Sequence, residues 1–120
     1  MSRHLALPVQ ADIALGDFAT EAGEVIVDAR MRCRIYGDPE LGSANGWILV
    51  FHALTGSHDV HQWWGPLLGD GLALDTTSHP VIAANLLGSC YGSSGPLPGI
   101  PFPALSPGDL AGAHNLLPGA

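Results

Sequence analysis

Apolar and polar residues alternate along one stretch of the chain, between Glu24 and Tyr36. The apolar positions are Val25, Val27, Ala29, Met31, Cys33 and Ile35, and the residues between them include Asp28, Arg30, Arg32 and Arg34. A period of two predicts extended backbone with one face in water, so we expect a hairpin or one long bent strand. Residues 1–23 show no clear period, and we expect them to form an irregular lead-in, or arm.

Two further stretches are apolar almost throughout, at residues 47–51 and 80–87. Both are rich in β-branched or aromatic residues, or in small apolar ones, and glycine bounds each of them. Such runs are typical of central parallel strands that are buried on both faces. The segment between them is long enough for a crossover connection that includes a helix. We therefore expect an α/β fold.

A helix is predicted near the end of the chain. Ser106 suits the N-cap position, Pro107 the first helical position and Asp109 the first turn. The helix is expected to run to about Leu117 and to stop at Pro118-Gly119. A stretch rich in glycine, proline and serine, residues 88–107, precedes it and is expected to be a loop.

Charge narrows the range of partners. The chain has 4 Lys and Arg residues against 11 Asp and Glu residues, a formal net charge of −7. We expect neither nucleic acid nor a membrane surface as a partner, because both attract basic proteins. The apolar runs are too short to span a bilayer, and the first residues do not resemble a signal peptide, so the expected compartment is the cytoplasm. Cys33 and Cys90 are expected to be buried, reduced thiols.

The candidate chemistry lies where the first buried strand ends, at residues 52–57. Ligands of open α/β sheets bind beyond the carboxyl ends of the strands, and backbone N–H groups in a turn there can stabilise an oxyanion. On spacing alone, an ordinary strand-to-loop turn is the more frequent explanation. His52, His58 and His61, with Asp59, also allow a zinc site, although three loop histidines beside a crevice are the favoured reading and no metal is expected.

Several motifs in order resemble the homoserine O-acetyltransferase family of α/β-hydrolase-fold acyltransferases. They are residues 51–57, Trp63-Trp64, residues 69–76, residues 85–96, residues 102–106 and the helix around Asp109. The resemblance covers about residues 34–117. It implies the N-terminal part of an α/β-hydrolase fold, with the first strands of the central sheet and the first long helix. Residues 1–23 would then be an arm and residues 24–120 a partial domain.

The resemblance also implies an activity. Members of the family transfer an acyl group from acyl-CoA to the hydroxyl of homoserine, in methionine biosynthesis, through a serine acyl-enzyme and a Ser-His-Asp triad. The backbone N–H of Leu54 would supply half of the oxyanion hole. Homoserine and acyl-CoA (acetyl-CoA) would be the small-molecule partners, with no bound cofactor, and the resemblance leaves a succinyl donor and a serine acceptor open. The complete protein would be a homodimer. No substrate-binding residue is assigned.

The chain departs from the family in one decisive respect. It contains no Gly-x-Ser-x-Gly nucleophile elbow, and it stops at Ala120, where the strand before that elbow would begin. We expect the chain alone to be inactive because the triad is absent. The alternative is a truncated, non-enzymatic protein that acts, if at all, through partner binding. Without the neighbouring strand, residues 47–51 would form an apolar sheet edge, which predicts a poorly soluble, oligomeric or molten chain.

Overall fold

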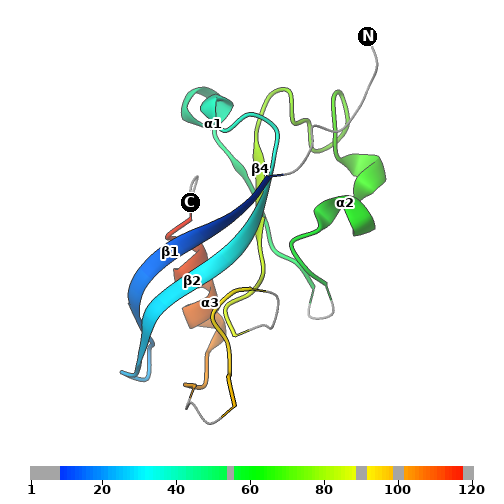
Figure 1. The fold of residues 1–120 in the computed structure, drawn as a ribbon. Coiled ribbons are helices and arrows are strands. Elements are labelled where there is room, and N and C mark those ends of the chain that lie inside the picture. Colours follow the sequence, from blue (N-terminus) through cyan, green and yellow to red (C-terminus); the bar gives the residue numbers. More distant parts are fainter. Residues whose placement is uncertain (1–8, 54–55, 89–91, 99–101, 118–120) are drawn as a thin grey trace.

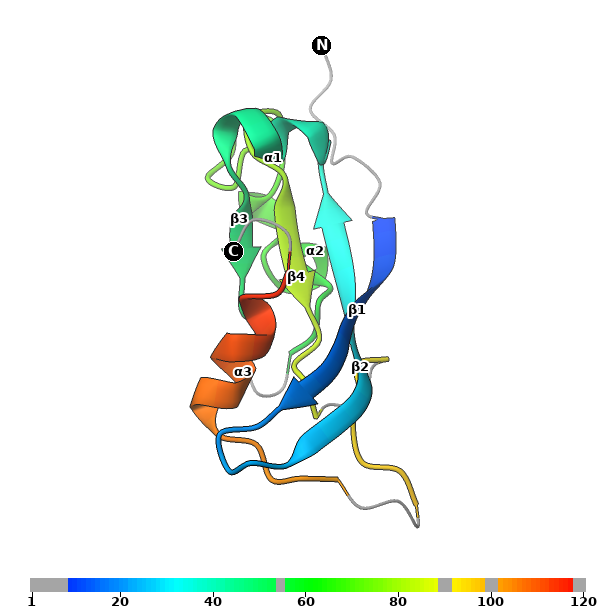
Figure 2. The ribbon, with the colours of Figure 1, turned by 90° about the vertical axis from the view of Figure 1, so that its left-hand side faces the viewer.

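The computed structural model describes residues 9–53, 56–88, 92–98 and 102–117. Its strands form one mixed sheet (Figure 1), and the order β1-β2-β4-β3 can be followed in Figure 2. The strands are β1 (Val9–Ala19), β2 (Val25–Tyr36), β3 (Ile48–Val50) and β4 (Val81–Ala84). β2 pairs antiparallel with β1 and with β4, whereas β3 and β4 are parallel. The helices are α1 (Glu40–Asn45), α2 (Val60–Trp63) and α3 (Pro107–His114), with a 3₁₀ turn at Gly65–Leu67.

The expected irregular lead-in is wrong for residues 9–19, which form β1 and pair along nearly the whole of β2. Alternating apolar residues do precede Gly16, but two β-bulges flank this glycine and break the period before Phe18. Gly16 has a φ of +70°, in the left-handed region that glycine adopts without steric cost. The bulges let Phe18 turn inward, where it is buried.

Of the two predicted forms, a hairpin or one long bent strand, β2 has the second. At Asp28, however, the set of alternate residues that faces the core changes from even to odd positions. Asp28 has a φ of +49°, and its N–H donates to the Asp17 carboxylate at 3.0 Å. Because this irregularity shifts the alternation, Ile26 is buried and Val25 and Val27 are exposed. The expectation that both valines face the core is therefore wrong.

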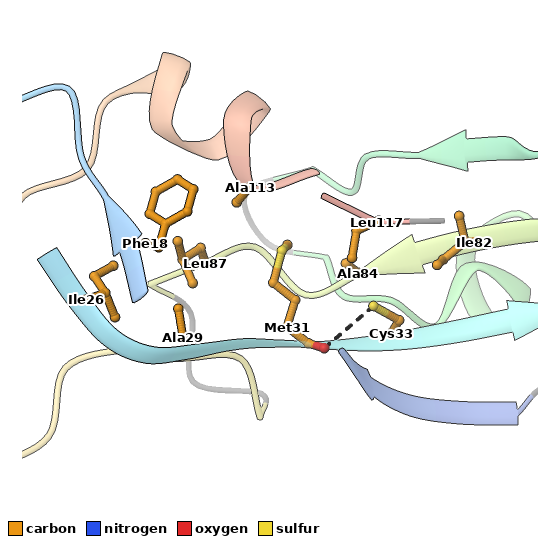
Figure 3. Close-up of a cluster of buried hydrophobic side chains, with 10 residues drawn as sticks. All are labelled: Phe18, Ile26, Ala29, Met31, Cys33, Ile82, Ala84, Leu87, Ala113 and Leu117. Carbon is orange, nitrogen blue, oxygen red and sulfur yellow. Dashed lines mark hydrogen bonds between the residues drawn. The ribbon is translucent and has the colours of Figure 1, made fainter. Parts of the chain in front are cut away.

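Side chains of β4 belong to two apolar cores, one on each face of the sheet. Ile82 and Ala84 pack in a core that α3 covers with Ala113, and this core is drawn in Figure 3. Val81 and Ala83 pack on the opposite face against Val60 of α2. Figure 2 shows α3 near the carboxyl ends of β3 and β4. The continuous apolar pattern of β4 thus has its expected cause, burial on both faces.

Cys33 lies in the first of these cores as a free, buried thiol, as predicted. Burial is the main cause that raises the pKa of this thiol to about 12, with a smaller contribution from Asp12. Cys33 is therefore a packing residue and not a nucleophile. Cys90 lies outside the described residues.

β3 is the predicted parallel strand, but it lies at the edge of the described sheet. Ile48 and Leu49 are only half-buried, and Phe51 just after the strand is 53% exposed. The expected burial on both faces is wrong for this strand because β4 is its only partner among the described strands. The exposed apolar edge anticipated from the resemblance is confirmed.

α3 begins as predicted. Ser106 accepts a hydrogen bond from the Asp109 N–H, and the Asp109 carboxylate accepts one from the Ser106 N–H, which together form a capping box. The helix ends at His114, earlier than the expected Leu117. Among the described helices, none has the length and hydropathy needed to cross a bilayer.

Candidate active site

The candidate site lies beyond the carboxyl ends of the two parallel strands. β3 leads into residues 51–58 and β4 leads into residues 85–88, and hydrogen bonds join these two segments. This edge of an α/β sheet is where ligands bind. Leu54, the predicted oxyanion donor, lies outside the described residues, so its role stays a prediction.

His52 joins the two strand ends. It is 8% exposed, its Nε2 is 3.1 Å from the Leu86 N–H, and its Nδ1 is 2.7 Å from the Ala53 carbonyl oxygen. Since a backbone N–H only donates and a carbonyl only accepts, Nε2 is the acceptor and Nδ1 carries the proton. One neutral tautomer therefore satisfies both bonds.

Asn85 makes the second connection between the segments. Its side chain is fully buried, and its Oδ1 accepts a hydrogen bond from the His58 N–H at 2.9 Å. Its backbone N–H donates to the Arg32 carbonyl oxygen at 2.8 Å, which extends the link to β2. The backbone after β3 is thus tied to β4 on both sides of residues 54–55.

Ser93 supports this arrangement from the loop that follows β4. Its Oγ donates to the Asn85 carbonyl oxygen at 2.6 Å and accepts from the Arg32 N–H at 3.0 Å. The Ser94 Oγ accepts from the Arg30 N–H at 2.9 Å. Both hydroxyls hold backbone, and neither contacts an imidazole among the described residues, so they lack the general base that a serine nucleophile needs.

The three histidines considered as metal ligands lie close to different hydrogen-bonding groups and do not converge on one point. His61 Nδ1 lies 2.7 Å from the Tyr36 hydroxyl, and Asp59 pairs with Arg34 at 2.8 Å. No group of three His, Cys, Asp or Glu side chains in the described ranges is arranged to hold a metal. The zinc alternative has no geometric support there.

His58 is buried beside this segment. Burial is the main cause that lowers the pKa of its imidazole, and the nearby carboxylate of Asp59 opposes the effect. Its Nε2 lies 3.5 Å from Gln10 Oε1, and its Nδ1 has no hydrogen-bond partner, although an Asp59 oxygen is 3.4 Å away. An ion pair with Asp59 would require a protonated imidazole, and the lowered pKa of His58 disfavours that form.

Phe51, the residue that follows β3, places an aromatic ring beside the carboxyl end of that strand. It stacks on His114 of α3 with a centroid separation of 4.3 Å and an interplanar angle of 27°. The contact brings the end of α3 to the end of β3, as Figure 2 shows for the two elements. The site is therefore framed by β3, β4 and α3.

A cavity of about 450 Å³ adjoins the β4 end, because Ser93 is one of its walls. Its lining residues are Val25, Ile26, Val27, Arg30, Ser93, Ser94, Gly95, Leu97, Phe102 and Pro103. Arg30 donates through Nε to the Gly92 carbonyl oxygen and has no carboxylate partner within the described ranges. The wall is thus mainly apolar with one cation.

The sequence alone assigned no chemical role to Asn85, and it considered the His52 side chain only as a possible zinc ligand and Ser93 only as a less favoured nucleophile. A signal for Asn85 existed, since a polar residue that ends an apolar strand in an α/β sheet lies at the ligand edge. His52 and Ser93 gave no comparable signal, because their partners are backbone groups of residues distant in sequence.

Sequence comparison identifies relatives along most of the chain. A homoserine O-acetyltransferase from Natronomonas pharaonis is 38% identical over 130 aligned positions, which cover 90% of this chain and 32% of the relative. The enzyme of the same name from Chlorobium luteolum is 41% identical over 97 positions, which cover 81% of this chain and 25% of the relative. No protein-family model matches the chain.

Solved structures give the same fold. The homoserine O-acetyltransferase from Staphylococcus aureus superposes with a TM-score of 0.74 at 29% identity, over 91% of this chain and 34% of that structure. An acetylester hydrolase from Corynebacterium glutamicum matches with the same TM-score at 23% identity, which supports the fold alone. The chain spans about a third or less of the length of these proteins, and the prediction of a partial α/β-hydrolase fold is confirmed.

Proposed function

We propose that this chain, a homologue of the homoserine O-acetyltransferases over most of its length, is part of an acyltransferase acting on homoserine. The observation that carries the proposal is the 38% identity over 90% of the chain, a share that includes the ends of β3 and β4. In the proposed reaction, an acyl group moves from acyl-CoA to the homoserine hydroxyl through a serine acyl-enzyme. The reaction belongs to methionine biosynthesis.

The contribution of this chain would be electrostatic. The Leu54 N–H is proposed as one of two backbone donors to the oxyanion that forms when the thioester carbonyl is attacked. A well-placed donor of this kind lowers the activation free energy by about 2.7–4 kcal/mol. The buried links from His52 and Asn85 to the β4 end support the proposal, because a fixed donor needs no reorganisation during the reaction.

The remaining machinery would come from outside these residues. The 120 residues include no Gly-x-Ser-x-Gly elbow, so the serine nucleophile and its His-Asp partners are proposed to belong to the part of the family protein that this chain does not span. Acetyl-CoA is the proposed donor, with no bound cofactor, and the complete protein is proposed to act as a homodimer in the cytoplasm.

A second candidate rests on the exposed apolar edge of β3. A chain with such an edge and no triad would act, if at all, by binding a partner. This non-enzymatic candidate differs from the first in one measurable respect: no protein that contains the chain would catalyse acyl transfer.

An acyl-transfer assay tests the proposal on two proteins. The purified 120-residue chain is expected to give no thiol release from acetyl-CoA with homoserine as acceptor. A chimaera in which residues 9–117 replace the superposable segment of the S. aureus enzyme is expected to turn over. Turnover by the 120-residue chain would contradict the assignment of the triad elsewhere. A folded but inactive chimaera would favour the non-enzymatic candidate.

A further inference from the structure

Two consecutive residues at the end of β4 hold both ends of the segment that follows β3. The Leu86 N–H donates to His52 Nε2 at 3.1 Å, before residues 54–55. The Asn85 Oδ1 accepts from the His58 N–H at 2.9 Å, after them. The two contacts lie on opposite sides of the proposed oxyanion donor in sequence, although they come from adjacent residues of one strand end.

We propose that His52 and Asn85 are positioning residues that form a clamp, which holds His52 and His58, on either side of the proposed donor in sequence, against the end of β4. The functional importance of the clamp rests on the proposed acyl transfer, whereas its existence does not. Neither side chain touches the reacting atoms in this proposal. Each acts through the backbone it holds.

The chemistry of His52 suits this role better than that of a general base. Both ring nitrogens are engaged with backbone groups, and the Ala53 carbonyl oxygen that accepts from Nδ1 also accepts from the Gly56 N–H at 2.8 Å. An imidazole whose two nitrogens are occupied cannot take a proton without losing the bond to Leu86. His52 is therefore a structural link between two backbone segments.

Hydrogen bonds to its own backbone hold Asn85 in place. Its backbone carbonyl accepts from Ser93 Oγ at 2.6 Å, and its N–H donates to β2 through the Arg32 carbonyl. With the side chain fully buried, this residue has little freedom to move. The clamp thus anchors His52 and His58 to the most deeply buried part of the sheet.

Amide exchange and nitrogen NMR test whether the clamp exists in the 120-residue chain. We expect the Leu86 and His58 amides to be protected and His52 to carry its proton on Nδ1. His52→Ala should speed exchange of the Leu86 amide at least tenfold, and Asn85→Ala should do so for the His58 amide. The β2–β4 ladder amides should stay protected in each variant. Rapid exchange of both clamp amides in the unmodified chain, alone or with the whole sheet, overturns the proposal, as does an Nε2-protonated His52.

Kinetics of the chimaera test what the clamp does. A misplacement of about 1 Å in a catalytic group can cost about 100-fold in rate, so His52→Ala is expected to lower kcat by about that factor with little change in KM. His52→Gln retains an acceptor for the Leu86 N–H and should restore much of kcat. The matched control is His79→Gln, since His79 contacts the Gly46 carbonyl near the start of β3 and lies outside the proposed machinery.

The two experiments separate the two proposals. An inactive chimaera with an intact clamp by NMR means that the proposed function fails and the clamp stands. An active chimaera whose kcat is unaffected by His52→Ala means that acyl transfer stands and the positioning role is overturned. A fall in kcat that His52→Gln reverses, with His79→Gln close to the unmodified chimaera, supports both.

Discussion

His114, at the end of α3, has one ring nitrogen bonded and the other buried without a partner. Its Nδ1 lies 2.9 Å from the Leu110 carbonyl oxygen, so Nδ1 carries the proton, and Nε2 has no hydrogen-bond partner in the described structure. Burial is the main cause that lowers the pKa of this imidazole from 6.5, and the Leu110 bond opposes it. Proximity to His52 lowers the pKa further.

The fold should therefore lose stability in mild acid. Because the folded pKa of His114 lies below the unfolded value of 6.5, the unfolded chain binds more protons as the pH falls through 6.5. The free energy of unfolding should decline from about pH 7 towards pH 5. His58, whose pKa is lowered mainly by burial, acts in the same direction.

Urea unfolding as a function of pH tests this for His114→Leu, which removes the titrating group and keeps an apolar side chain against Phe51. The variant should show a shallower decline below pH 6.5 than the unmodified chain. At pH 8 both imidazoles are neutral, so any difference there measures the change in packing and the lost hydrogen bond to the Leu110 carbonyl, and it serves as the internal reference. An unchanged slope would contradict the role given to His114.

The residues that build the candidate site were only partly predictable. The strand end at residues 52–57 was identified because an apolar run followed by a glycine-containing turn is a local signal. The link from His52 to Leu86 depends on the pairing of β3 with β4, and a single sequence does not encode that proximity locally. The same holds for Ser93, whose partners lie on β2 and at the end of β4.

At the scale of elements, the two glycines of α3 differ in the space available for a side chain. A Cβ at Gly108 would collide with the Glu21 carboxylate, which contacts Ser106 Oγ. The Asp109 carboxylate also accepts from the Glu21 N–H at 2.8 Å, so the hairpin turn and the start of α3 meet here. A Cβ at Gly112 would meet only the Phe18 ring, at an ordinary contact distance of 3.9 Å.

Gly112→Ala is therefore expected to stabilise the chain by about 0.5–1 kcal/mol, through helix propensity and a smaller loss of backbone entropy. Gly108→Ala is the matched control, since it makes the same chemical change in the same helix. It should give a smaller gain, because the exposed Glu21 side chain must move away from Ser106. Equal stabilisation by the two substitutions, measured by urea unfolding, would refute this account.

Element prediction failed where backbone irregularity interrupted a regular pattern. Val9, Ala11, Ile13 and Leu15 alternate as a strand requires, but the bulges at Gly16 conceal the strand from a search for one period. Asp28 has the same effect in β2, where it places Ile26 inside and its two valine neighbours outside. α3 was predictable because the capping box is encoded within four consecutive residues.

At the scale of the whole molecule, β3 leaves one edge of the sheet open. The Ile48 N–H donates to the Pro80 carbonyl oxygen, so by alternation the N–H and C=O of Leu49 point away from β4. Phe51, 53% exposed, adds apolar surface next to this edge. An unpaired apolar edge is a template for pairing with another strand.

Sedimentation velocity should therefore show an average mass that rises with concentration for the 120-residue chain. Phe51→Lys places a charge beside the edge and should shift this rise to concentrations about tenfold or more higher, because charges oppose edge pairing. Leu97→Lys is the matched control, since Leu97 is 61% exposed and lies in the loop after β4. A concentration-independent monomer would contradict the prediction.

The fold class and the parallel pair could be predicted because buried parallel strands have a distinctive composition and the family motifs follow one another in order. The edge position of β3 was anticipated from the resemblance, since composition alone suggested a central strand. The fold does not test the predicted role of the Leu54 N–H in the oxyanion hole, because this residue lies outside the described ranges.

The open edge of β3 also determines how the sheet can grow. All the other described strands lie on one side of β3, and the pairing of β3 with β4 uses only one of its two edges. A further strand can therefore join by forming new hydrogen bonds to Leu49, and no existing pair has to break first. Growth by addition at one end would make the four described strands a template, on which a further strand of a larger domain can fold.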